Sequence, residues 1–220
     1  MIHSSFSIGE KFSKKYSSVA NSFSENEKLH ILTDKPHYFA NCLTYKYNQN
    51  PMSYMDKIIF AVELSVKNKE DVLYYDIDSP IIRDKLIHKI QSDKVLIPWL
   101  WLDWPYSTYE SLELLFVHDW LGDFLWDKLD YYPIPNIHEE VLFFPYSDKS
   151  ESLLSDLKYV KPLWEKSLLK TVKDVQSKGK PVTKYHKYGI GSSEGFALSV
   201  CLIKNDIQFE EYNFFKKNLM

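Results

Sequence analysis

The first eighty residues alternate short apolar runs with longer stretches in which apolar residues recur every three or four positions. The short runs predict buried strands, and the longer stretches predict helices with one apolar face. We expect strands at 2–7, 28–34, 40–47 and 72–75, and helices at 12–23 and 54–68. This order is typical of βαβ units, in which the two strands are parallel. The predicted fold class is α/β, with a mixed, mostly parallel central sheet flanked by helices.

The second half of the chain has a weaker periodicity. We expect strands at 95–100 and 141–146, and helices at 81–90, 112–129, 153–164 and 194–203. Residues 99–109 are unusually rich in aromatic side chains, with three tryptophans and two tyrosines. Aromatic residues at this density either form core or offer flat faces on which a sugar ring can stack, and the pattern leaves both interpretations open.

The composition is that of a globular protein. With 45% hydrophobic and 16% aromatic residues, the 220-residue chain is expected to be one globular domain. Its 27 basic and 30 acidic residues are not clustered, so no nucleic-acid partner is predicted. No apolar run reaches the roughly 20 residues that cross a bilayer, and no secretory signal is visible. Cys42 and Cys201 lack metal-ligand spacing, so we expect reduced thiols and a cytoplasmic location.

The most informative stretch is the strand that ends in Asp76-Ile77-Asp78, followed by Ser79-Pro80. If the chain stays extended, Asp76 and Asp78 share a face, and two neighbouring carboxylates there favour a bound cation or hydrogen-bond donors. A hard divalent ion that also binds phosphate oxygens is the natural occupant. The alternative is a solvated turn in which both acids cap backbone N–H groups.

Two further polar segments are expected at the same edge of the sheet, because binding crevices in parallel sheets lie at the carboxyl ends of the strands. They are 4–8 at the end of the first strand and Thr33-Asp34 at the end of the second. Gly9 stands alone, so neither a dinucleotide-binding glycine motif nor a P-loop is present. Near the end of the chain, Glu194 opens a predicted helix; it is either a first-turn acid favoured by the helix dipole or a residue that contacts substrate.

Taken together, the segment ending in Leu32-Thr33-Asp34, the helix that carries Lys57, and the run 72–78 resemble the nucleotide-sugar half of GT-A glycosyltransferases. The stretches 141–164 and 193–198 resemble later elements of the same family. The resemblance implies a single GT-A, Rossmann-like domain over residues 1–220. Residues 1–80 would bind the nucleotide sugar, and residues 81–220 would form the acceptor side.

The resemblance also implies roles for named residues. Asp76 and Asp78 would hold Mn²⁺ or Mg²⁺ against the diphosphate of a UDP-sugar, and Lys57 would approach the phosphates. The base and ribose would be contacted by Ser5, Phe6, Ser7 and Asp34. The late histidine ligand of the family is not recognisable, and His186 is only a weak substitute.

The resemblance implies transfer of a hexose or deoxyhexose, such as glucose or rhamnose, from a UDP-sugar donor to a glycan acceptor. An inverting reaction needs a carboxylate that deprotonates the acceptor hydroxyl. Five acids of the second half are candidates, with Glu194 first and Asp103 second; the others are Asp119, Glu139 and Glu140. The alternatives are a non-catalytic nucleotide- or carbohydrate-binding module, and a phosphohydrolase or nucleotidyltransferase. The chain ends without an obvious cap, which is compatible with further domains after Met220.

Overall fold

The computed structural model describes residues 1–23, 27–49, 52–83, 90–101, 136–177 and 194–219. In these residues the central sheet has seven strands in the order β3-β2-β1-β4-β8-β5-β9. A separate pair consists of β6 (Leu100–Trp101) and β7 (Asn136–Ile137). The strands of the sheet are β1 (Ile2–Ser7), β2 (His30–Thr33), β3 (Leu43–Lys46), β4 (Val72–Tyr75), β5 (Val95–Ile97), β8 (Val141–Phe144) and β9 (Phe209–Glu211).

The sheet is mixed but mostly parallel, which confirms the predicted fold class. Strands β3, β2, β1 and β4 run parallel to one another, and β5 is parallel to β9. Strand β8 lies between β4 and β5 and is antiparallel to both. The three strands with polar segments at their ends, β2, β1 and β4, are neighbours, so these segments meet at one edge of the sheet.

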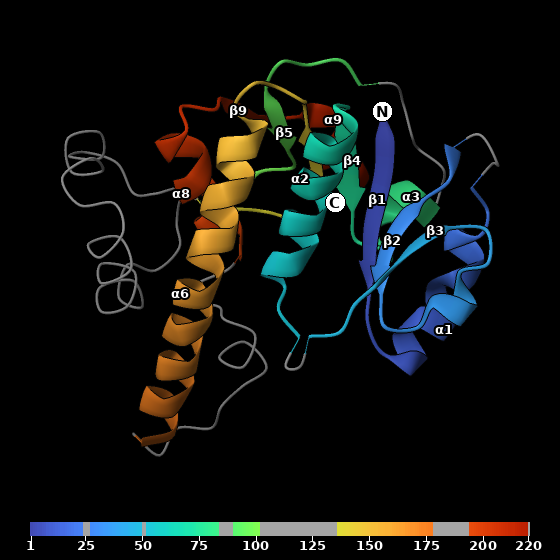
Figure 1. Ribbon diagram of the computed structural model, residues 1–220, viewed down its shortest axis with the longest axis horizontal. Coiled ribbons are helices and arrows are strands. Elements are labelled where there is room, and N and C mark those ends of the chain that lie inside the picture. The colour runs from blue at the N-terminus through green and yellow to red at the C-terminus, as the bar shows by residue number, and fades with distance from the viewer. Residues whose placement is uncertain (24–26, 50–51, 84–89, 102–135, 178–193, 220) are drawn as a thin grey trace.

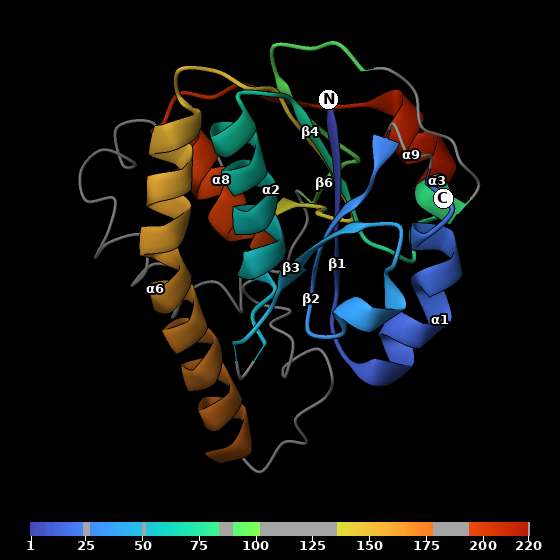
Figure 2. The ribbon, with the colours of Figure 1, turned by 45° about the vertical axis from the view of Figure 1, so that its right-hand side comes forward.

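Helices cover both faces of the sheet (Figures 1 and 2). One face carries α2 (Met55–Asn68), α6 (Ser150–Ser177) and α8 (Glu194–Lys204). The other carries α1 (Glu10–Ala20), α3 (Pro80–Arg83) and α9 (Asn213–Leu219), and a short 3-10 helix, η2, spans Pro36–Tyr38. No helix among the described residues is long and apolar enough to cross a membrane.

Strand β4 lies at the centre of the core. All four of its side chains are buried, because each face of the strand packs against a different apolar cluster. Val72 and Tyr74 belong to the cluster under α2, α6 and α8, whereas Leu73 and Tyr75 belong to the cluster under α1, α3 and α9. A strand buried on both faces reads as a continuous apolar run, which is why its bounds were predicted correctly.

Several predicted elements differ from the observed ones. The strand predicted at 95–100 is divided between β5 and β6, and the strand predicted at 40–47 is confined to Leu43–Lys46. Of the helix predicted at 81–90, Pro80–Arg83 is helical and 84–89 lie outside the described residues. The helix predicted at 112–129 and most of the aromatic segment also lie outside them. Strand β9 and helix α9 were not predicted.

Candidate functional site

The two aspartates follow β4 in a tight turn, not in an extended strand. Strand β4 ends at Tyr75; the N–H of Asp76 donates to the carbonyl of Glu140 (2.8 Å), and the N–H of Ser79 donates to the carbonyl of Asp76 (2.9 Å). Ile77, which lies between the two acids, is buried, whereas Asp78 is exposed. The expectation that both carboxylates share one face of an extended strand is therefore wrong, because the backbone turns directly after Tyr75.

The side chain of Asp76 belongs to a cluster that contains a buried lysine. Lys57, in the first turn of α2, is only 4% exposed. Its Nζ lies 3.1 Å from Glu194, 3.5 Å from Asp76 and 4.0 Å from Glu139. We call Lys57, Asp76, Glu139 and Glu194 the Lys57 cluster. Its members come from α2, from the turns beside β4 and β8, and from the start of α8, so tertiary folding assembles it.

Charges within the cluster shift its ionisation. Burial alone would lower the pKa of Lys57, but Asp76, Glu194 and Glu139 together raise this pKa above its ordinary value. Burial raises the pKa of Asp76, and Lys57 and Tyr74 offset only part of that increase. Burial, followed by the neighbouring Glu194, raises the pKa of Glu139 well above the ordinary glutamate value. Three carboxylates around one ammonium carry excess negative charge, so Glu139 holds its proton to a higher pH than an ordinary glutamate does.

The position of Lys57 changes its expected role. The resemblance implied that Lys57 approaches a donor's phosphates, but its ammonium is buried and faces carboxylates. In this arrangement Lys57 acts first as a counter-charge that fixes the acids around it. Glu194, the first-choice base, is likewise nearly buried and belongs to the same cluster. The structure thus brings together three of the predicted site residues, which are far apart in sequence.

The remaining predicted residues lie at the ends of the neighbouring strands or within them. Asp34, directly after β2, accepts a hydrogen bond from the N–H of Gly9 (2.9 Å), whose φ of 90° suits glycine. Ser5, Phe6 and Ser7 are buried in β1; Phe6 packs against Tyr47, and the hydroxyl of Ser7 lies 3.0 Å from that of Ser13. Asp103 and His186 lie outside the described residues.

The acidic turn offers two carboxylates as possible ligands of a small hard cation. Lys57 and Tyr74 both donate to Oδ1 of Asp76, which leaves its Oδ2 without a hydrogen bond among the described residues. Asp78 is exposed and makes no hydrogen bond or ion pair within the same residues. The described part of the chain contains no group of three or more His, Cys, Asp or Glu side chains that could hold a metal. Mg²⁺ is usually held by one or two carboxylates together with phosphates and water, so two carboxylates are sufficient.

Glu139 was one of five candidate acids in the sequence, but its place in the cluster was not predicted. The only local signal was the acidic pair Glu139-Glu140 directly before a buried strand. That pair becomes informative only once β8 is known to run antiparallel to β4, because this pairing puts the start of β8 beside the end of β4. Comparison with known proteins adds no assignment: no protein-family model matches the chain, and the search of curated proteins gave no match.

Proposed function

We propose that this chain is a metal-dependent glycosyltransferase of the GT-A type that moves a hexose or deoxyhexose, such as glucose or rhamnose, from a UDP-sugar to a glycan acceptor. The observation that carries the proposal is the acidic turn Asp76-Ile77-Asp78 at the carboxyl end of the central strand β4. Ligands of open parallel sheets bind at this edge. The resemblance of the first eighty residues to the nucleotide-sugar half of the family supports the same assignment.

In this proposal, Oδ2 of Asp76 and the carboxylate of Asp78 hold Mn²⁺ or Mg²⁺. The ion would neutralise the charge that grows on the diphosphate when the bond to the sugar breaks. Lys57 holds Asp76 in place through Oδ1, so that the other oxygen can face the ligand. Asp34, directly after the neighbouring strand β2, would contact the base and ribose; the side chains of Ser5, Phe6 and Ser7 are buried and would not reach them.

The base that activates the acceptor would be one of the acids of the second half of the chain. Glu194 remains the first candidate and Asp103 the second. Glu194 lies 3.1 Å from the buried Lys57 and is 5% exposed.

The burial of Glu194 favours a second candidate function, a non-catalytic nucleotide- or carbohydrate-binding module. Among the described acids of the cluster, each carboxylate lies within 4.0 Å of the Lys57 ammonium and is already held by that ion pair. A module of this kind would bind a nucleotide sugar at the acidic turn without consuming it.

Turnover separates the two functions. The purified chain is incubated with UDP-glucose or a UDP-deoxyhexose and Mn²⁺, and the release of UDP is measured with and without a glycan acceptor. A transferase releases UDP, and Asp78→Asn abolishes the release. Asp148→Asn, an acid in the turn before α6, serves as the control and retains activity. Binding of the donor without release of UDP would support the module, and release of inorganic phosphate or pyrophosphate would instead indicate a phosphohydrolase or nucleotidyltransferase.

A further inference from the structure

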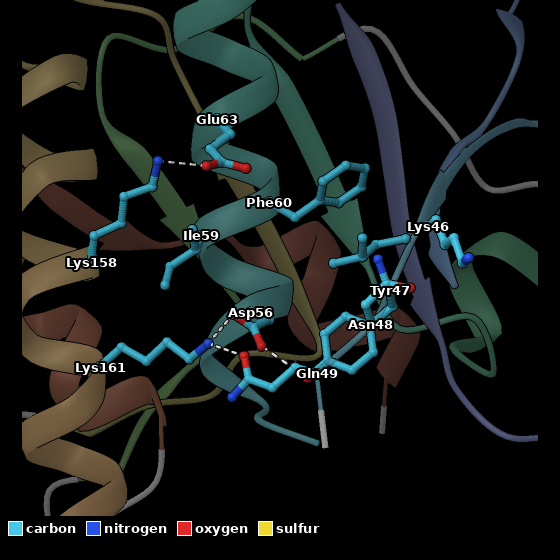
Figure 3. Close-up of a pocket in the computed structure, with 11 residues that line it drawn as sticks. Lys46, Tyr47, Asn48, Gln49, Asp56, Ile59, Phe60, Glu63, Lys158 and Lys161 are labelled. Carbon is cyan, nitrogen blue, oxygen red and sulfur yellow. Dashed lines mark hydrogen bonds and ion pairs between the residues drawn. The ribbon is translucent and has the colours of Figure 1, made fainter. Parts of the chain in front are cut away.

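A groove with a volume of about 430 Å³ opens between the edge of the sheet and helices α2 and α6 (Figure 3). Its lining includes no member of the Lys57 cluster. The volume falls within the range of roughly 300–1,000 Å³ that small-molecule sites occupy. Part of the lining is apolar and comes from Leu32 of β2 and from Ile59 and Phe60 of α2.

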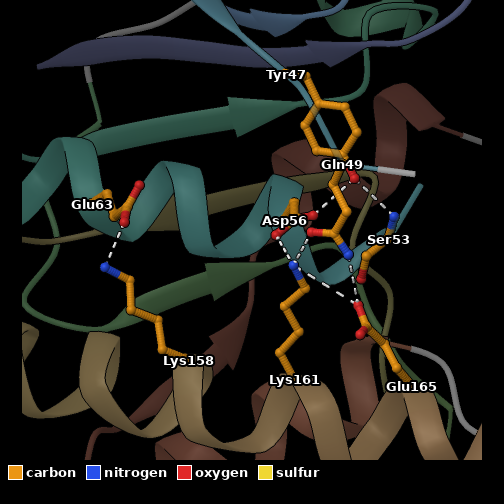
Figure 4. Close-up of polar contacts among 8 residues, drawn as sticks. All are labelled: Tyr47, Gln49, Ser53, Asp56, Glu63, Lys158, Lys161 and Glu165. Carbon is orange, nitrogen blue, oxygen red and sulfur yellow. Dashed lines mark hydrogen bonds and ion pairs between the residues drawn. The ribbon is translucent and has the colours of Figure 1, made fainter. Parts of the chain in front are cut away.

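One wall of the groove is a network of fixed polar groups (Figure 4). Asp56, in the first turn of α2, accepts hydrogen bonds from the hydroxyl of Tyr47 (2.9 Å) and from Lys161 of α6 (2.6 Å). The Tyr47 hydroxyl also accepts the N–H of Ser53 (2.9 Å). Lys161 donates to the amide oxygen of Gln49 as well. Because each group is held by two neighbours, the wall is ordered before any ligand arrives, which lowers the cost of binding.

The charges of this wall are already paired. Lys161 is paired with Asp56, and Lys158 lies 2.6 Å from Glu63, so a second ion pair joins the same two helices. At this wall an anionic ligand would have to compete with these carboxylates, whereas a neutral hydroxyl can donate to one partner and accept from the other. Lys46, which also lines the groove, makes no ion pair within the described residues, and this is why the test below includes inorganic phosphate as a competitor. Between Tyr47 and Gln49 in the sequence, the exposed side-chain amide of Asn48 also lines the groove; it makes no hydrogen bond within the described residues and can both donate and accept.

We propose that this groove binds a neutral carbohydrate of one or two rings. A pyranose has a C–H face that matches the apolar lining and a rim of hydroxyls that matches paired donors and acceptors. The groove supplies both on adjoining surfaces, at a volume suited to a ligand of that size. This binding goes beyond the proposed transfer reaction and does not depend on it, because the two sites share no residue.

Saturation-transfer difference NMR on the full chain tests the proposal, with the methyl glycosides of glucose, galactose and rhamnose and with maltose as probes. At least one probe should receive saturation and bind in the millimolar range. Asn48→Ala, at an exposed position that does not threaten folding, should weaken that binding about fivefold, the effect of one lost hydrogen bond. Lys161→Met should weaken sugar binding more than Asn48→Ala does, because the substitution removes a partner of both Asp56 and Gln49.

Lys204→Met is the matched control. Lys204 also forms a 2.6 Å ion pair with an aspartate on a neighbouring helix, Asp156, but neither residue lines the groove. This variant should bind the probe as the wild type does, and so should Asp78→Asn, which removes only the proposed metal ligand. The proposal is overturned if no probe binds, if Asn48→Ala has no effect, if Asp78→Asn abolishes binding, or if inorganic phosphate displaces the sugar at equal concentration.

Discussion

Lys57 is the residue on which the candidate site depends most. It is the ammonium that compensates three nearby carboxylates while itself almost completely buried. Removing one partner of a buried ion pair leaves uncompensated charge, which costs much more than losing a pair at the surface.

Lys57→Met should therefore lower the free energy of unfolding by about 3–5 kcal/mol, measured by urea denaturation. Lys158→Met is the matched control: its ion pair with Glu63 is exposed, so its loss should cost less than about 1 kcal/mol. Equal losses in the two variants would mean that Lys57 does not hold the cluster together.

Glu139 makes the stability of the folded protein depend on pH. Its folded-state pKa is raised well above the ordinary value of 4.5, first by burial and then by Glu194. The folded protein therefore holds this proton to a higher pH than the unfolded chain does. Between the two pKa values the folded state binds more protons, so this group lowers stability as the pH rises through that interval.

Glu139→Gln removes the titration and should make the protein more stable than the wild type at neutral pH. The difference should shrink towards pH 4.5, where the wild-type carboxyl becomes protonated in both states. Thermal unfolding at pH 4.5, 6 and 7.5 measures the trend. A variant that is less stable than the wild type at neutral pH would show instead that the charged form of Glu139 is favoured in the fold.

At the scale of elements, α2 connects the two candidate sites. Its first turn supplies Lys57 to the cluster, and the neighbouring Asp56 lines the groove. The helix ends at Lys69, which adopts the left-handed conformation, with φ of 56° and ψ of 43°. Glycine takes this conformation without the steric cost that a Cβ introduces.

Lys69→Gly should therefore raise the free energy of unfolding by up to about 1 kcal/mol, because relief at the cap exceeds the added flexibility of the unfolded chain. Lys67→Gly, at an exposed position inside the last turn of α2, is the control and should lower it by about 1 kcal/mol. Urea midpoints compare the two. If both variants lose stability equally, Lys69 is not strained.

The elements also show where sequence patterns were sufficient. Strands β1 and β4 have the predicted bounds, and both are buried along their whole length; β4 is also flanked by Asp71 and Asp76. Strand β9 was missed because two of its three residues, Glu210 and Glu211, are exposed acids; β9 is an edge strand held by its pairing with β5. Its place in the sheet follows from a partner more than a hundred residues away, which no local pattern reveals.

At the scale of the whole molecule, the sequence predicted the edge of the sheet where the polar strand ends meet, but not the contacts made there. The adjacency of β2, β1 and β4 follows from the repeated strand–helix–strand order. The turn at Asp76 instead depends on the carbonyl of Glu140, and the burial of Lys57 depends on Glu194. These contacts join segments separated by more than sixty residues, so they exist only after the second half has packed against the first.

The central claim is that Asp76 and Asp78 bind a divalent cation which in turn binds a nucleoside diphosphate. Thermal unfolding with UDP, in Mn²⁺ or in EDTA, tests it most directly. At a hundredfold excess over its Kd, UDP should raise the Tm by roughly 5–10 °C in Mn²⁺ and much less in EDTA. Asp78→Asn should fold normally, because Asp78 is exposed, and should lose this difference. An equal rise in Mn²⁺ and EDTA, or no rise in either, would contradict the account.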